Sequence, residues 1–77
     1  MIRCHLARVM GDKRLKIVDV ARDTGINRGT ITRMYHDQAE RIELEVLDVL
    51  CSYLEIEVGE LYEFLGDSEE ISNDLDK

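Results

Sequence analysis

The chain of 77 residues has room for one small domain and carries a formal net charge of −7. This length excludes the layered sheet of a typical cofactor enzyme, and no apolar run approaches the roughly 18 residues of a membrane span. Because the opening residues MIRCHLARVMGDKR contain no signal-peptide core and the two cysteines stand far apart, we expect a cytoplasmic protein with reduced thiols.

Helical periodicity accounts for almost every segment of the chain, which contains no proline. In chain order, the predicted helices span about residues 2–13, 17–24, 28–36, 44–54 and 59–65. Apolar stripes support the first and fourth helices: Ile2, Leu6, Val9 and Met10, and then Leu44, Leu47, Leu50, Cys51 and Leu54. No segment alternates as a strand would, so the predicted fold class is all-α. We assign residues 1–66 to the domain and residues 67–77 to an acidic, flexible tail.

The segment between the second and third helices reads GIN and has the chemistry of a tight turn. Gly25 follows the second helix, where a left-handed residue commonly ends a helix. Asn27 is a favourable N-cap for the third helix. With this cap, Ile26 and Ile31 occupy the two positions of a hydrophobic staple, which fixes the start of the third helix at Arg28.

Two further residues make this segment a predicted helix-turn-helix. Ala21 is small, as a steep crossing of two helices requires, and Met34 lies one turn after Ile31 on the same face of the third helix. Ile31 and Met34 should therefore point into the core. The same geometry also serves as plain packing in helical bundles, so it does not by itself establish DNA binding.

The outward face of the third helix is polar and cationic. Its predicted members are Arg28, Gly29, Thr30, Thr32, Arg33 and His36. A helix of about nine residues is roughly 13 Å long, which suits a major groove about 12 Å wide. Arg28 is the first candidate to read a base, since a guanidinium binds guanine O6 and N7 together. Arg33 suits a phosphate or a second base, and Gly29 suits a close approach of backbone to DNA.

Charge is distributed unevenly along the chain. Residues 1–41 hold nine basic residues against five acidic ones, whereas residues 42–77 hold twelve acidic residues and one lysine. This asymmetry indicates a basic working surface and an acidic remainder, although ordinary solvation of the surface would also account for it. An acidic half that faces away from DNA would discourage non-specific binding, because that binding is mostly electrostatic.

The segments LKIVDVARDTGINRGTITRMYHD and IELEVLDVLCSYLEIEVGELYEFL resemble the Xre-type, Cro/repressor-like helix-turn-helix domains. The resemblance covers about residues 4–66. It implies a compact, five-helix, lambda-repressor-like domain that binds duplex DNA and regulates transcription. It also implies DNA contacts by the start and outer face of the third helix: Asn27, Arg28, Gly29, Thr30, Thr32 and Arg33.

The chain departs from the family pattern at both ends of this motif. Many members begin the second helix with a Ser or Thr cap and a glutamine that touches phosphate and braces the recognition helix. Here those positions hold Lys16, which can reach a phosphate, and Ile17, which cannot form a hydrogen bond. Ile17 and Val18 place apolar side chains near the DNA-facing side, where the candidate contacts are a thymine methyl group and a partner chain. Asp37 replaces the glycine that commonly follows the third helix, and Arg41 is a candidate phosphate contact.

Catalytic and metal sites find little support in the sequence. The serines have no evident His–Asp partners, Cys51 suits the core, and no phosphate-binding glycine loop is present, so we expect no enzyme activity, cofactor or metal. The alternative to a DNA-binding regulator is a protein-interaction module, such as an antitoxin-like partner. A homodimer would have to use the fourth and fifth helices, with Tyr53, Tyr62 and Phe64 among the candidate contacts.

Overall fold

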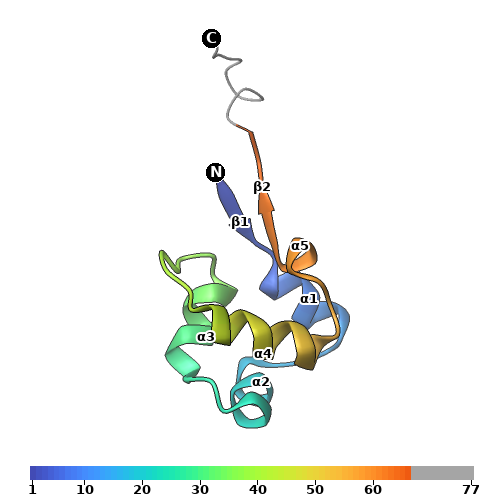
Figure 1. Ribbon diagram of the computed structural model, residues 1–77. Coiled ribbons are helices and arrows are strands. Elements are labelled where there is room, and N and C mark those ends of the chain that lie inside the picture. Colours follow the sequence, from blue (N-terminus) through green and yellow to red (C-terminus); the bar gives the residue numbers. More distant parts are fainter. Residues whose placement is uncertain (67–77) are drawn as a thin grey trace.

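Five helices and two short strands make up residues 1–66, the part of the chain that the computed structural model describes (Figure 1). In chain order they are β1 (Ile2–Cys4), α1 (Leu6–Asp12), α2 (Ile17–Thr24), α3 (Arg28–Tyr35), α4 (Leu44–Leu54), α5 (Val58–Leu61) and β2 (Tyr62–Phe64). The fold is mostly helical, which confirms the predicted fold class. The tail assigned to residues 67–77 lies outside the described residues.

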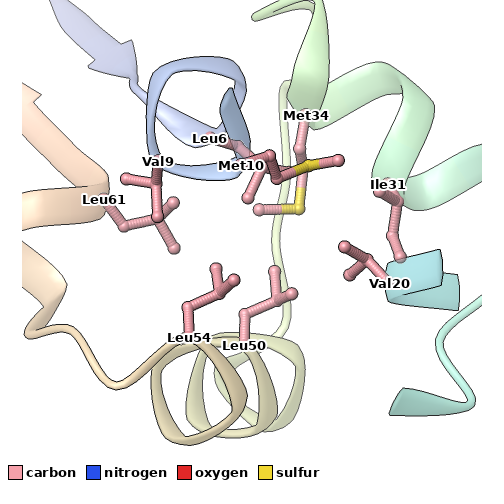
Figure 2. Close-up of a cluster of buried hydrophobic side chains, with 9 residues drawn as sticks. All are labelled: Leu6, Val9, Met10, Val20, Ile31, Met34, Leu50, Leu54 and Leu61. Atoms are coloured by element: carbon pink, nitrogen blue, oxygen red, sulfur yellow. The ribbon is translucent and has the colours of Figure 1, made fainter. Parts of the chain in front are cut away.

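The core is built by apolar side chains that converge from all five helices (Figure 2). The buried set is Leu6, Val9, Met10, Val20, Ile31, Met34, Leu50, Leu54 and Leu61. The helices α1, α3 and α4 each present residues three or four positions apart to this cluster, and α2 and α5 each contribute one buried residue. This shared core fixes α3 relative to its neighbours and leaves the other face of α3 in solvent.

The predicted bounds are correct for α2 and α4, and α3 ends one residue earlier than predicted, at Tyr35. The end of α2 and the start of α3 have local signals that are readable in the sequence. Gly25 stops α2 in a left-handed conformation, and Asn27 caps α3. Local chemistry therefore sets the helix-turn-helix segment.

The prediction of one helix over residues 2–13 is wrong at its start. Ile2–Cys4 form β1, and α1 begins only at Leu6. Ile2 is 60% exposed and takes no part in the core. The cause is a long-range pairing, since β1 lies antiparallel to β2 with Ile2 opposite Phe64. Three residues are too few to show a strand pattern, and the partner strand lies about 60 positions away in the sequence.

The prediction of a fifth helix over residues 59–65 is wrong at its end. The helix α5 spans Val58–Leu61, and the chain then becomes extended as β2. The amide of Leu65 donates to the carbonyl of Met1 at 2.8 Å. The strands extend side by side away from the helices, and α2 lies at the opposite end of the helical body (Figure 1).

The predicted core face of α4 also needs one correction. Leu50 and Leu54 are fully buried and Leu47 and Cys51 are partly buried, but Leu44 is 81% exposed. Leu44 is the first residue of α4. It therefore lies beyond the edge of the core, although its spacing places it on the apolar stripe.

Candidate nucleic-acid interface

The turn between α2 and α3 depends on a glycine and a threonine. Gly25 has φ +76°, and its N–H donates to the Ala21 carbonyl at 3.0 Å. A Cβ at Gly25 would meet nothing within 4 Å, so the backbone conformation and not the space requires glycine. The Thr24 hydroxyl donates to the Val20 carbonyl at 2.6 Å and accepts the Ile26 N–H at 3.2 Å. This role of Thr24 was not predicted from the sequence, although hydroxyl residues commonly stabilise turns.

Asn27 caps α3 through its side-chain oxygen. Asn27 Oδ1 accepts the N–H of Gly29 at 2.7 Å and the N–H of Thr30 at 3.4 Å. A Cβ built on Gly29 would lie 3.0 Å from this same oxygen. The glycine therefore has a reason inside the molecule, because a larger residue would press on the cap.

The inward face of α3 is fully committed to packing. Ile31 and Met34 have no exposed surface, and both side chains point into the cluster of Figure 2. Ala21 and Ile26 are partly buried and pack against the same core. The four apolar residues assigned to the helix-turn-helix thus join the turn to the body of the domain.

The outward face of α3 carries the predicted polar residues. Arg28 and Arg33 are exposed, whereas Thr30 and Thr32 are half-buried. The Thr32 hydroxyl donates to the Arg28 carbonyl at 2.8 Å, so its proton is used inside the helix. Arg33 Nη2 donates to Thr30 Oγ1 at 3.4 Å. Arg28 is therefore the cation at the first turn of α3, and the Arg33–Thr30 pair lies along the side of the helix.

The side of α3 that carries Thr30 and Arg33 faces the loop before α4. A surface hollow between them is lined by both residues and by Arg41, together with Ile42 and Val46. Arg41 is exposed. The structure thus brings the predicted loop cation to the same surface as Thr30 and Arg33 of α3.

The start of α2 lies beside the other side of α3. A shallow groove is lined by Leu15, Lys16, Ile17, Val18, Arg28 and Tyr35. Lys16 is exposed at the N-cap position of α2 but forms no side-chain cap, because an ammonium group has no acceptor. Its backbone N–H instead donates to Asp19 Oδ2 at 2.9 Å. Ile17 is partly buried and packs against the core.

A protein-family model described as the Cro/C1-type HTH DNA-binding domain matches residues 5–67. The chain belongs to this family. Neither the curated proteins nor the solved structures include a significant match. The match covers every element from α1 to β2 and the whole helix-turn-helix. The chain is therefore a DNA-binding domain, in a family that is typically not enzymatic.

In this Cro/C1-type domain, Asp37 ends the recognition helix without glycine. Asp37 has φ +59°, and the bonds from the Asp37 N–H to the Met34 carbonyl and from the Gln38 N–H to the Arg33 carbonyl close the last turn. Aspartate tolerates this conformation better than most residues. Asp37 itself therefore adopts the left-handed conformation that a glycine commonly provides at this position.

The Asp37 carboxylate also connects the recognition helix to β1. Asp37 Oδ1 accepts the Cys4 N–H at 3.1 Å, and Arg3 Nη1 lies 3.4 Å from Asp37 Oδ2. These contacts span more than thirty residues of sequence, so no local pattern predicts them. The link fixes the end of α3 against the two-stranded sheet of the Cro/C1-type domain.

A second polar link joins α2 to α4. The Tyr53 hydroxyl donates to Asp23 Oδ2 at 2.6 Å, and Arg22 Nε donates to Asp23 Oδ1 at 3.0 Å. The Tyr53 hydrogen bond, followed by that of Arg22, lowers the pKa of Asp23 below its ordinary value. Tyr53, predicted as a dimer contact, thus has its hydroxyl engaged within the chain.

The cysteines of the Cro/C1-type domain have the character of packed thiols. Both are free, and burial raises the pKa of Cys4 and of Cys51 above the ordinary value. A raised pKa lowers the fraction of reactive thiolate.

Within residues 1–66, no three His, Cys, Asp or Glu side chains lie together as a metal site. None of the described helices is long and apolar enough to cross a membrane.

Proposed function

We propose that the protein is a sequence-specific regulator of transcription that inserts α3 into the major groove of duplex DNA. The observation that carries this proposal is the division of α3 into two faces. Ile31 and Met34 are fully buried, while Arg28 and Arg33 are exposed. At about 1.5 Å per residue, the eight residues of α3 are about 12 Å long, comparable to the width of the major groove.

The proposed contacts follow from position along this surface. Arg28, at the first turn of α3, reads guanine O6 and N7. Arg33 and Thr32 contact a second base or a phosphate, and Thr30 holds the Arg33 guanidinium at 3.4 Å. Four flanking residues approach the DNA backbone: Lys16, Asn27, Gly29 and Arg41. Ile17 lies at the apolar edge of the same protein surface. Phosphate contacts of this kind set register, and base contacts set specificity.

Arg28→Ala, with Arg8→Ala as its matched control, tests the proposal. Arg8 is also exposed, but it lies beside Ile56 and Glu60, away from α3. Loss of a bidentate base contact should cost about 1–3 kcal/mol of binding free energy and relax specificity at one base pair. Arg8→Ala should change affinity by much less.

The experiment begins with selection of bound duplexes from a random pool, followed by fluorescence anisotropy titrations at several salt concentrations. A regulator of the proposed kind should enrich a defined motif, and its affinity should fall steeply with salt. A protein-interaction module would enrich no motif and would bind DNA equally well with either variant. Equal affinities of the Arg28→Ala and Arg8→Ala proteins for the motif would contradict the assigned role of Arg28.

We further propose that the regulator binds DNA as a homodimer, because one recognition helix reads only a few base pairs. The sequence predicts a dimer surface on the fourth and fifth helices. Of its candidate contacts, Phe64 lies in the strand β2. Phe64 is 70% exposed and lies opposite Ile2 in the sheet. These adjacent apolar side chains are the proposed contact between two copies.

Phe64→Ser tests this contact, with Leu44→Ser as the control because Leu44 is equally apolar and even more exposed. Light scattering should show the mass of a dimer for the Leu44→Ser protein and that of a monomer for the Phe64→Ser protein. A two-fold-symmetric motif from the random pool would be the matching DNA result. An unchanged dimer mass in Phe64→Ser would exclude this surface.

A further inference from the structure

The groove between the start of α2 and the recognition helix has a composition that suits one chemical group of DNA. Its lining combines the apolar side chains of Leu15, Ile17 and Val18 with two cations, Lys16 and Arg28. Phosphates attract such cations, and apolar side chains beside them favour an uncharged, apolar group. The groove is continuous with the proposed DNA-binding surface, because Arg28 belongs to both.

Val18 is the apolar residue of this groove that the fold itself does not use. It is 45% exposed and belongs neither to the buried core nor to the side chains packed against it. Ile17, its neighbour, is partly buried and packs on the core. A nonpolar, β-branched side chain therefore stands in solvent beside the cation that is proposed to bind guanine.

In the major groove, the edges of the base pairs expose donors, acceptors and one kind of apolar group, the 5-methyl of a pyrimidine. We propose that Val18, with Ile17 beside it, binds the 5-methyl group of a pyrimidine in a base pair adjacent to the guanine read by Arg28. The inference rests on the proposed function and adds a specificity-determining residue to it. Thymine and 5-methylcytosine carry the same group and are the two sources of this ligand.

The expected effect follows from the size of the buried group. Removing one methyl-sized group from water contributes roughly 0.8 kcal/mol, which corresponds to about fourfold in affinity. The effect of Val18 should therefore be small, local to one base pair and independent of salt. A phosphate contact would differ on the last point, because its contribution falls with salt.

Deoxyuridine provides the direct test, since it differs from thymine only by the missing methyl. Each thymine of the selected duplex is replaced singly, and affinities are measured by anisotropy for the wild-type, Val18→Ala and Val58→Ala proteins. Val58 is the matched control, because it is 53% exposed on α5 and lines a different hollow. The wild-type and Val58→Ala proteins should lose about threefold to fivefold at one position in each half-site. The Val18→Ala protein should show no loss there.

A second set of duplexes identifies the source of the methyl group. At the sensitive position, a C·G pair is compared with its 5-methylcytosine counterpart. A gain of about fourfold on methylation supports reading of either pyrimidine, and a methyl effect with thymine alone supports the proposal with thymine as the ligand.

Two results would overturn the inference: indifference of the wild-type protein to every deoxyuridine, or full methyl discrimination by Val18→Ala. Binding that still depends on Arg28 would then leave the proposed function standing. Failure to enrich any motif would instead refute the proposed function itself. A urea titration of each variant confirms that the substitutions leave the fold intact.

Discussion

Gly29 offers the sharpest test of how the recognition helix is built. Replacing glycine by alanine within a helix usually stabilises it by up to about 1 kcal/mol. Here the new Cβ would lie 3.0 Å from Asn27 Oδ1, which is closer than an ordinary contact. The cap must then shift, and its hydrogen bonds to the N–H groups of Gly29 and Thr30, now 2.7 and 3.4 Å long, would lengthen.

The two effects have similar size and opposite sign. An N-cap contributes typically about 1 kcal/mol, so Gly29→Ala in the wild-type chain should change the free energy of unfolding by less than about 0.5 kcal/mol. In an Asn27→Ala background the conflict is absent, and the same substitution should stabilise by about 1 kcal/mol. The predicted coupling between the two sites is therefore about 0.5–1.5 kcal/mol.

The assay is urea unfolding followed by circular dichroism for the wild-type, the two single variants and the double variant. Asn27→Ala alone should destabilise by about 1 kcal/mol. If Gly29→Ala changed the free energy of unfolding equally in both backgrounds, the cap would not be the reason for glycine. Close approach of the DNA to the backbone of α3 would then be the remaining explanation for glycine at this position.

Three further outcomes test the core, the end of α3 and the link between α2 and α4. Ile31→Ala should lower the free energy of unfolding by about 2–5 kcal/mol, whereas Leu44→Ala, at a residue 81% exposed, should change it by less than about 0.5 kcal/mol in the same urea assay. Asp37→Ala combines a strained left-handed conformation with loss of the acceptor for the strand amide, so it should cost about 1–3 kcal/mol. Asp37→Asn, which keeps an oxygen acceptor, should cost less, and equal losses would refute the role of that acceptor. Because the folded-state pKa of Asp23 is depressed, its stabilisation is present above the ordinary value of 3.8 and is lost as pH falls through the lower folded value. Between about pH 6 and about pH 2.5 the wild type should therefore lose more stability than Tyr53→Phe, and parallel pH profiles would show that the hydrogen bond has no such effect.

The helix-turn-helix could be predicted because its determinants are local. Gly25 provides the left-handed turn, Asn27 satisfies free amides of the next helix, and Ile31 and Met34 share one helical face. Each of these effects acts within about one helical turn along the chain. The end of α2, the start of α3 and the division of α3 into two faces follow from them.

The two-stranded sheet could not be predicted in the same way. The pairing of Ile2 with Phe64 depends on how the helices bring the two ends of the domain together. The carboxylate of Asp37 that accepts the Cys4 N–H depends on the same packing. For Leu44 the local pattern is correct but the core ends before it. These features depend on how distant parts of the chain pack together, so the local sequence pattern does not predict them.

The central claim is that α3 occupies the major groove with Arg28 on a guanine. Dimethyl sulfate methylates guanine N7, an atom on the major-groove edge, so protection from it reports contact there. On the selected duplex, the wild-type protein should protect a specific guanine N7. The Arg28→Ala protein, at a concentration that saturates the duplex, should leave that guanine reactive. Absence of any N7 protection by the bound wild type, or unchanged protection by Arg28→Ala, would contradict the account.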